Sequence, residues 1–457
     1  MSVYAVTNPA TGVVEATYPT ATDADIQVAL GHTGDAFGPW STTAPGKRAA
    51  LLARVADLYE ERRDELAAII TREMGKPIFQ SGKEIAITAA IYRYYAANGE
   101  KFLSDEELDV ATGGTALIRK EGVGVLLGIM PWNFPYYQVA RFAAPNLMNG
   151  NTILLKHAPQ CPESALAMEK IFIDAGAPEG AYVNIFATND QVAEIIADAR
   201  VQGVSLTGSE RAGSAVAAIA GANLKKVVLE LGGSDPFLVL ADADTKRAAK
   251  QAMFGRFGNT GQACNAAKRI IVDASIYDQF VGDFTGAVAG IKMGDPSVPD
   301  TFLGPLSSAA ARDGLDAQVQ DAIDKGATVL AAGGPVDGPG SFYAPTVLAD
   351  VTEEMRAYTE ELFGPVAVLY KVEGEEAAIE LANSSAYGLS ASIQTQDMDK
   401  AHEIARKLEV GMVSINQTSA SAPELPFGGV KRSGVGRELG KYGMEEFVNR
   451  KLVTFRG

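Results

Sequence analysis

Cysteine and histidine are scarce in this chain of 457 residues, which contains only two cysteines, Cys161 and Cys264. Two cysteines cannot form a disulfide framework, so we expect a protein of the reducing cytoplasm. The three histidines are His32, His157 and His402, and no two of them have the spacing of metal ligands. We therefore expect no metal site, and a Ser-His-Asp triad has few candidates.

Basic side chains and long apolar runs are also lacking. Lysine and arginine number 40 against 56 aspartates and glutamates, giving a net charge of −16, which disfavours nucleic acid or an anionic membrane as a partner. The apolar stretches are interrupted well short of the roughly 18 residues that a membrane-spanning helix needs. The N-terminus has no charged-then-apolar signal pattern. We expect an acidic cytoplasmic protein without membrane contact.

The hydrophobic pattern predicts an α/β protein of at least two domains, as the length also requires. From Gly124 onward, short apolar runs alternate with helical periodicity, which is typical of a parallel, doubly wound sheet. A second α/β region is predicted from about Ser234 to about Arg432. The predicted strands are 125–129, 151–155, 183–186, 203–206, 269–272, 328–330, 366–370 and 412–416.

Two predicted strands of the first region end at positions suited to a nucleotide. Parallel sheets bind nucleotides at the carboxyl ends of their strands, where Lys156 and Gly208 stand. The helix that begins at Ser209 could present free N–H groups to a pyrophosphate. The motif is not a P-loop, because Ser214 and Ala215 stand where Lys-Ser/Thr is required.

One cysteine lies in a glycine-rich turn and is a candidate nucleophile. Cys264 ends the segment Phe-Gly-Asn-Thr-Gly-Gln-Ala-Cys, where backbone N–H groups can stabilise a thiolate. Glu230 stands in an apolar run before two glycines, where burial would raise its pKa and make it a proton acceptor. Asn133 lies between two prolines and could donate to an oxyanion. Taken singly, Cys264 could be a buried hydrophobe and Glu230 an ordinary strand-end carboxylate.

Together these elements resemble the aldehyde dehydrogenase superfamily over essentially the whole chain. Within the superfamily, the chain resembles bacterial succinate-semialdehyde dehydrogenases through stretches such as Arg141-Phe-Ala-Ala-Pro and Glu424-Leu-Pro-Phe-Gly-Gly-Val-Lys-Arg-Ser-Gly434. The superfamily motifs are Pro131-Trp-Asn-Phe-Pro135, Lys156, Thr207-Gly-Ser-Glu-Arg-Ala-Gly213, Glu230-Leu-Gly-Gly233, Gly261-Gln-Ala-Cys264, Glu361-Leu-Phe-Gly-Pro365 and Pro426-Phe-Gly-Gly429.

The resemblance implies a Rossmann-type cofactor domain (1–103 and 122–233), an α/β catalytic domain (234–432) and a small bridging sheet. The sheet would come from 104–121 and 433–457 and join a homodimer or homotetramer. The implied reaction is oxidation of an aldehyde to a carboxylate with NAD(P)+. The Cys264 thiolate would attack the carbonyl, Asn133 and the Cys264 N–H would hold the oxyanion, and Glu230 would activate the water that hydrolyses the thioester.

Cofactor contacts are implied for Lys156 at the adenosine ribose, Gly208 and Ser209 at the phosphate, Glu361 at the nicotinamide ribose, and Trp132 and Phe363 beside the cofactor. Relatives restricted to NAD often carry a glutamate three residues after the lysine, where this chain has Pro159. Without that repulsion NADP should be accepted. The preference between NADP and NAD stays open, because NADP-preferring relatives commonly have a serine there.

Arg141 is the implied clamp for a distal carboxylate, with Tyr137 and Ser421 beside the substrate. A bare arginine could equally be a surface or interface ion-pair partner. Some relatives have a second arginine where this chain has Gly258. A broad-specificity enzyme for neutral aliphatic or aromatic aldehydes therefore remains an alternative, and a non-redox thiol acyltransferase or hydrolase is another. Cys161 is expected to lie far from the site.

Overall fold

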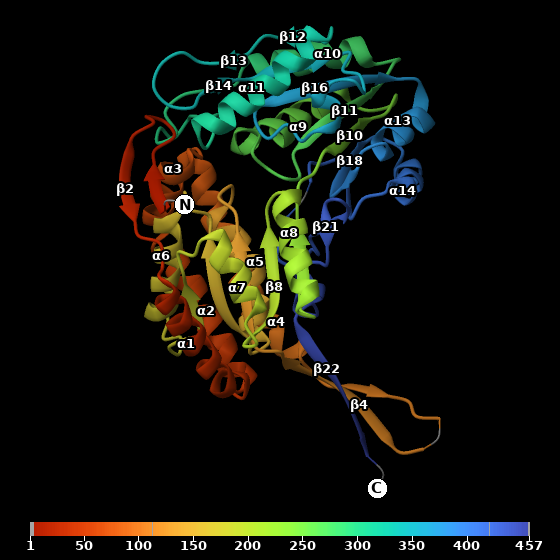
Figure 1. Cartoon of the computed structure of the whole chain (residues 1–457). Coiled ribbons are helices and arrows are strands. Elements are labelled where there is room, and N and C mark those ends of the chain that lie inside the picture. Colours follow the sequence, from red (N-terminus) through yellow and green to blue (C-terminus); the bar gives the residue numbers. More distant parts are fainter. Residues whose placement is uncertain (1–3, 112, 420, 456–457) are drawn as a thin grey trace.

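The computed structural model describes residues 4–111, 113–419 and 421–455. The predicted terminal and bridging segments therefore include a few positions, at 1–3, 112 and 456–457, that lie outside the described residues. Figure 1 shows two α/β bodies, one above the other, with a thin β arm that extends from the lower body. None of the described helices is long and apolar enough to cross a membrane.

The lower body contains a six-stranded sheet of order β21-β9-β8-β5-β6-β7. Five strands run parallel, and β21 is antiparallel to β9. Their buried Val, Leu and Ile runs are typical of a sheet covered on both faces. The strands are β5 (Val125–Met130), β6 (Thr152–His157), β7 (Tyr182–Asn184), β8 (Val201–Thr207), β9 (Lys226–Glu230) and β21 (Gly434–Val435). The helices after them are α5 (Pro135–Met148), α6 (Pro162–Asp174), α7 (Asn189–Ala197) and α8 (Glu210–Ala222).

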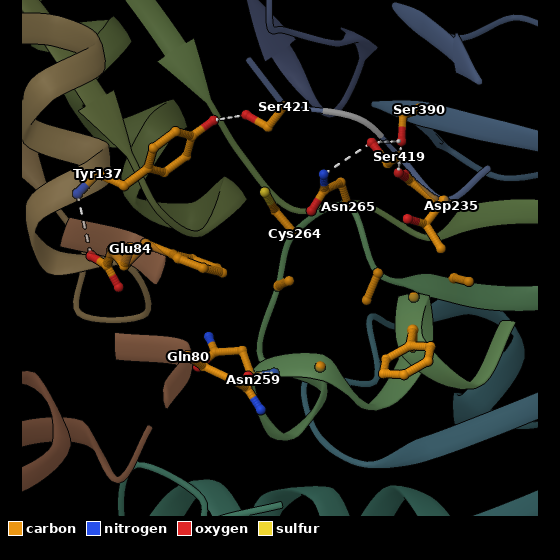
Figure 2. Close-up of a pocket in the computed structure, with 18 of the residues that line it drawn as sticks. Gln80, Glu84, Tyr137, Asp235, Asn259, Cys264, Asn265, Ser390, Ser419 and Ser421 are labelled. Carbon is orange, nitrogen blue, oxygen red and sulfur yellow. Dashed lines mark hydrogen bonds between the residues drawn. The ribbon is translucent and has the colours of Figure 1, made fainter. Parts of the chain in front are cut away.

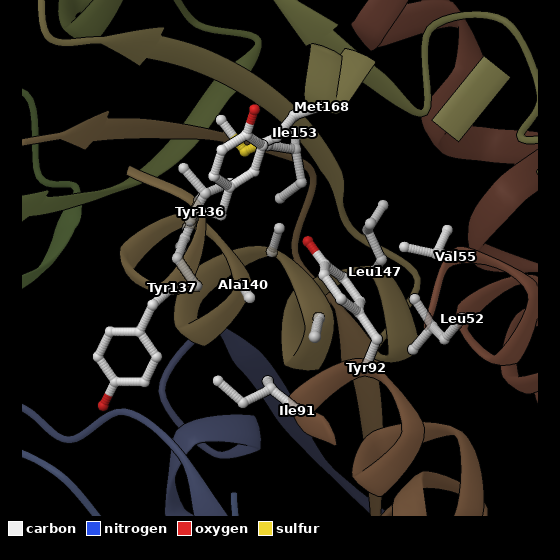
Figure 3. Close-up of a cluster of buried hydrophobic side chains, with 14 of the residues drawn as sticks. Leu52, Val55, Ile91, Tyr92, Tyr136, Tyr137, Ala140, Leu147, Ile153 and Met168 are labelled. Carbon is white, nitrogen blue, oxygen red and sulfur yellow. The ribbon is translucent and has the colours of Figure 1, made fainter. Parts of the chain in front are cut away.

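The N-terminal helices wrap this sheet, as the helical periodicity of that region predicts. They are α1 (Asp23–Ser41), α2 (Pro45–Glu61), α3 (Arg63–Met74) and α4 (Ile78–Phe102), with a hairpin of β1 (Tyr4–Thr7) and β2 (Val14–Tyr18) before them. Figure 3 shows Leu52 and Val55 of α2 and Tyr92 of α4 packed against Leu147 of α5 and Ile153 of β6. Each fully buried aliphatic side chain contributes about 1.5–3 kcal/mol. This apolar contact fixes α4 against α5.

The upper body contains a seven-stranded sheet of order β12-β15-β16-β11-β10-β18-β19. All neighbours are parallel except β12 and β15. The strands are β10 (Asp235–Val239), β11 (Ala267–Asp273), β12 (Thr328–Ala331), β15 (Thr346–Ala349), β16 (Val366–Val372), β18 (Ser390–Gln394) and β19 (Met412–Ile415). The helices are α9 (Thr245–Phe257), α10 (Tyr277–Ala289), α11 (Ala309–Asp324), α12 (Arg356–Thr359), α13 (Gly374–Asn383) and α14 (Met398–Lys407).

The arm is a three-stranded antiparallel sheet in which β4 (Thr115–Gly122) pairs with β3 (Glu106–Leu108) and with the tail strand β22 (Val448–Phe455). Leu108, Leu452 and Phe455 are exposed on it. The predicted small sheet is thus present, with the hairpin formed by β3 and β4. Short elements complete the fold: β13 (Gly334–Pro335), β14 (Tyr343–Ala344), β17 (Tyr387–Gly388), β20 (Val430–Lys431) and α15 (Gly440–Met444).

Candidate active site

The candidate residues gather where two sheet edges face each other. Trp132 and Asn133 follow β5, Lys156 is near the end of β6, and Ser209 follows β8, so all stand at the carboxyl edge of the six-stranded sheet. Cys264 precedes β11 by a few residues and so stands at the amino edge of the seven-stranded sheet. Open parallel sheets place ligands at such carboxyl ends.

A cavity of about 440 Å³ opens beside the candidate nucleophile. Cys264, Arg141, Tyr137 and Ser421 all line it. In Figure 2 the Cys264 sulfur lies between Tyr137 and Ser421 on one side and a cluster of serines on the other. The structure therefore brings the predicted nucleophile and all three predicted substrate residues to one cavity.

The turn before Cys264 has an uncommon backbone. Helix α9 ends at Phe257, and the 3-10 turn Gly258–Gly261 follows, in which Asn259 and Thr260 have φ values of 53° and 56°. Gly261 also has a positive φ, and a Cβ there would lie 2.3 Å from the Gly364 carbonyl oxygen. Only glycine fits at that position. Strained turns of this kind need outside contacts to hold them.

Arg256 supplies one set of these contacts. Its fully buried guanidinium donates to the carbonyl oxygens of Gly261 at 3.2 Å, Leu362 at 2.7 Å and Val366 at 2.6 Å. Because a buried guanidinium is costly unless its N–H groups are satisfied, the contacts tie the turn firmly to the segment before β16.

Lys268 supplies the other set. Its Nζ donates to the carbonyl oxygens of Ala263 at 2.9 Å and Cys264 at 2.7 Å, and pairs with Glu361 Oε1 at 2.8 Å. Glu361 also accepts the Gly233 N–H at 3.2 Å. The Cys264 backbone is thereby fixed to the strand end that carries Glu230.

Burial dominates the acidity of the nucleophile. It raises the pKa of the Cys264 thiol to about 12, although the positive charges of Arg141 and Lys268 lower it. Glu230 and Glu361 add to the rise. Desolvation outweighs both cations here, although Cys264 is only partly buried. The thiol needs a proton acceptor before it can react.

Glu230 is the candidate acceptor. It ends β9, is 2 % exposed, and neither carboxyl oxygen has a hydrogen-bond partner among the described residues. Burial raises its pKa well above the usual range, while Arg141 and Arg437 lower it and Glu438 raises it. A raised pKa makes this carboxyl group a stronger proton acceptor when it is ionised.

Asn133 is tied to the nucleophile's turn. Its buried Nδ2 donates to the Gln262 carbonyl oxygen at 3.1 Å, two residues before Cys264. Its own carbonyl oxygen accepts from Lys76 Nζ at 2.9 Å and Asn259 Nδ2 at 3.0 Å. Asn133 and Glu230 are not among the residues that line the cavity.

Arg141 of α5 is 1 % exposed, with its Nε 2.6 Å from Glu438 Oε2. Arg141 therefore forms an ion pair, and this pair is buried and does not lie on the surface. The guanidinium carbon lies 5.0 Å from the Tyr137 ring centroid and 4.3 Å from that of Phe427. Nη1 and Nη2 are buried and have no hydrogen-bond partner in the part of the chain that the structure describes. The Tyr137 hydroxyl is hydrogen-bonded to Ser421.

The predicted cofactor residues lie outside the cavity. Lys156 makes no ion pair with a described residue, and burial lowers its pKa to about 8. Gly208 follows β8, and Ser209 then caps α8, accepting the Ala212 N–H at 3.3 Å. The rings of Trp132 and Phe363 meet edge to face, with centroids 5.7 Å apart.

Comparison with known proteins settles the family. The aldehyde dehydrogenase family model matches residues 2–453. The chain is 52 % identical to a succinate-semialdehyde dehydrogenase [NADP(+)] of Deinococcus radiodurans, over 98 % of this chain and 94 % of that protein. The chain belongs to the aldehyde dehydrogenase family. The corresponding protein of Mycobacterium avium is 45 % identical over 98 % of this chain and 95 % of its own. The crystal structure of succinic semialdehyde dehydrogenase from Streptococcus pyogenes with NADP+ has a TM-score of 0.97 and 42 % identity, covering 99 % and 100 % of the two chains.

Several residues of this family member escaped sequence reasoning. Arg256, Lys268 and Glu438 were assigned no role, although each contacts a candidate residue or its turn. Each of these charged residues stands inside or beside a glycine-containing motif, which is the signal that could have drawn attention to it. The local sequence does not show which distant residue it contacts. Cys161 was expected far from the site, yet its Sγ lies 4.0 Å from the Trp132 carbonyl oxygen. It is fully buried behind that segment.

Proposed function

We propose that the protein oxidises succinate semialdehyde to succinate, with NADP+ as the preferred hydride acceptor and NAD+ as a possible substitute. The observation that carries the proposal is the cavity shared by Cys264 and Arg141, whose two terminal nitrogens are unpartnered. A charged guanidinium suits the distal carboxylate of this substrate. The similarity to the NADP(+) succinate-semialdehyde dehydrogenase of Deinococcus radiodurans and to the NADP+-bound enzyme of Streptococcus pyogenes supports the same substrate and cofactor.

In the proposed mechanism Glu230 accepts the Cys264 proton and the thiolate attacks the aldehyde carbon. Asn133 Nδ2 and the Cys264 N–H stabilise the oxyanion of the thiohemiacetal; such donors typically contribute about 3–4 kcal/mol each. Hydride loss from the carbon leaves a thioester on Cys264. The proton on Glu230 passes to bulk water, which restores the carboxylate. Glu230 then takes a proton from a second water molecule as its oxygen adds to the thioester; the C–S bond breaks, succinate leaves, and the released thiolate takes the proton back from Glu230.

The chain fits a dinucleotide at the carboxyl edge of the six-stranded sheet, where the buried Lys156 ammonium makes no ion pair with a described residue and α8 begins after β8. NADP+, when bound, supplies the hydride acceptor. Lys156 would hold the adenosine ribose and its 2′-phosphate, and the start of α8 at Gly208 and Ser209 would face the pyrophosphate. Glu361 would hold the nicotinamide ribose, and Trp132 and Phe363 would lie beside the cofactor. Pro159 offers no carboxylate to repel the 2′-phosphate.

Preference for NADP+ should weaken at alkaline pH. Because the pKa of Lys156 is about 8, its charge is present at pH 7 and mostly lost by pH 9.5. We expect the Kd of NADP+ to rise about tenfold more than that of NAD+ over this range, as a charge-assisted contact is lost. Fluorescence titration of both cofactors measures this. Lys156→Met should give a pH-independent ratio, and an unchanged ratio in the native protein would refute the assignment of Lys156.

Removal of the Arg141 charge should abolish selectivity for the acid semialdehyde. A charge-assisted hydrogen bond contributes about 1.5–3 kcal/mol, so Arg141→Met should lower kcat/KM for succinate semialdehyde by about 10²-fold. Butanal should lose less, since it lacks the carboxylate, although the pKa of Cys264 will rise without Arg141. Initial rates of NADPH formation at 340 nm give the ratio of the two substrates.

Arg141→Met alone leaves Glu438 buried without its cation, which destabilises a protein strongly. The matched variant Arg141→Met/Glu438→Gln removes both charges. If the clamp assignment is correct, the double variant recovers stability but not selectivity. Recovery of selectivity together with stability would show that Arg141 acts only in packing.

A broad aldehyde dehydrogenase is the second candidate, and the cavity itself favours it. Its walls include the aromatic rings of Phe79, Phe254 and Phe302, and a Cβ at Gly258 would meet nothing within 4 Å. Such a space exceeds the needs of a four-carbon substrate. Comparable kcat/KM values for benzaldehyde and succinate semialdehyde would favour this function.

We further propose that residues 1–103 and 122–233 form the cofactor domain and 234–432 the catalytic domain. Residues 104–121 and 433–457 would join a homodimer or homotetramer through the arm, whose exposed Leu108, Leu452 and Phe455 support a partner surface. The cytoplasm would be the site of action.

A further inference from the structure

Two charged side chains of the N-terminal helical layer reach the cavity wall. Helix α3 ends at Gly75, which has a φ of 78° and would meet Pro305 at 2.6 Å if it carried a Cβ. Lys76 follows at once and is 1 % exposed. Glu84 lies in the second turn of α4, is 3 % exposed, and forms an ion pair with Lys76. Both line the cavity.

Lys76 holds the segment that carries the proposed oxyanion donor. Its Nζ donates to the Asn133 carbonyl oxygen at 2.9 Å and lies 3.7 Å from the Phe134 ring centroid. A change in the position of Lys76 would therefore move the backbone of Asn133 directly. The Asn133 amide would move with it.

Glu84 holds the start of the helix that carries the proposed substrate clamp. Phe134, at the N-cap position of α5, makes no side-chain cap, so the first N–H groups of the helix need another acceptor. Glu84 Oε1 accepts them from Tyr136 at 2.9 Å and Tyr137 at 3.2 Å. Figure 2 shows the bond to Tyr137 at the edge of the cavity.

Glu73, on helix α3 of the same layer, indicates what Lys76 adds to Glu84. Glu73 caps α6 in the same manner, accepting the N–H groups of Glu163 at 2.7 Å and Ser164 at 3.2 Å. No ion pair of Glu73 is found in the described chain. A buried glutamate without an ion pair to a described residue therefore also caps a helix here, although burial raises the pKa of Glu73 to about 8. A buried ion pair adds little stability over an apolar pair, so the distinct contribution of Lys76 is its hold on Asn133.

We propose that Lys76 and Glu84 form a positioning pair for aldehyde oxidation, which sets the oxyanion donor Asn133 and the first turn of α5 relative to Cys264. The inference rests on the proposed function. Neither side chain takes part in the chemistry. Their effect is exerted on kcat, because a donor displaced by about 1 Å lowers transition-state stabilisation by up to about 10²-fold.

The test compares Lys76→Met, Glu84→Gln and the double variant Lys76→Met/Glu84→Gln. We expect each to lower kcat at least about tenfold for both succinate semialdehyde and butanal, with KM and the NADP+ Kd changed less than about threefold. Glu84→Gln leaves Lys76 as an unpaired buried cation and should lower Tm. The double variant removes both charges, so its Tm should recover while kcat stays low.

Glu73→Gln is the matched control, a buried cap of α6 that does not contact the cavity. It should lower Tm with kcat within about twofold of the native enzyme. A double variant whose kcat recovers together with its Tm would overturn the positioning role, as would a folded Lys76→Met with native kcat. An inactive native enzyme would contradict the proposed function instead, since every comparison here is made against native turnover.

Discussion

Cys264→Ala is expected to abolish oxidation of every aldehyde, with kcat reduced by at least about 10⁴-fold, because loss of a covalent nucleophile removes the whole reaction path. The fold should persist, since the turn is held by Arg256 and by backbone contacts of Lys268 rather than by the thiol. Production of NADPH at 340 nm and a thermal melt measure the two effects.

Cys161→Ala is the matched control for the nucleophile. Cys161 is fully buried behind Trp132, so its loss should affect stability more than turnover.

Alkylation by iodoacetamide should modify Cys264, and the rate of alkylation should rise about tenfold per pH unit from pH 7 to 10, because the pKa of Cys264 is about 12. Retained turnover in Cys264→Ala would remove the basis of the proposed mechanism.

Glu230→Gln should separate hydride transfer from hydrolysis. The amide cannot accept a proton, so we expect steady-state kcat to fall by about 10²–10⁴-fold, the usual range for a general base. The thioester should accumulate, giving up to one equivalent of NADPH per site in a rapid-mixing experiment, followed by very slow turnover. The first turnover should be slowed as well, because Glu230 also takes the thiol proton.

The accumulated acyl group should appear as a mass increase on the peptide that contains Cys264. Glu73→Gln again serves as a control, since it replaces a buried carboxylate remote from the cavity. A steady-state rate of Glu230→Gln within about tenfold of native, without acyl enzyme, would exclude Glu230 as the base.

The sequence predicts which strands carry the candidate residues better than it predicts the contacts that hold those residues in place. The strands β5, β6 and β8 follow from their apolar runs and the intervening helical periodicity, and their parallel pairing puts Asn133, Lys156 and Ser209 at one edge. These are local patterns, because a buried strand needs apolar residues and a cap needs a hydroxyl.

The supporting contacts join distant parts of the chain, which local patterns do not encode. Arg141 pairs with Glu438 far along the chain, and Lys76, between α3 and α4, meets Asn133 just before α5. The pKa of Cys264 shows the same limit, since the balance between burial and nearby cations depends on the assembled cavity.

The most direct test of substrate assignment is the ratio of kcat/KM values for succinate semialdehyde and butanal with NADP+, measured on the native enzyme at pH 7.5. If Arg141 binds the distal carboxylate, the ratio should reach at least about 10², as expected for a charge-assisted contact that butanal cannot make. Equal values for the two aldehydes would contradict the carboxylate clamp and leave a general aldehyde dehydrogenase.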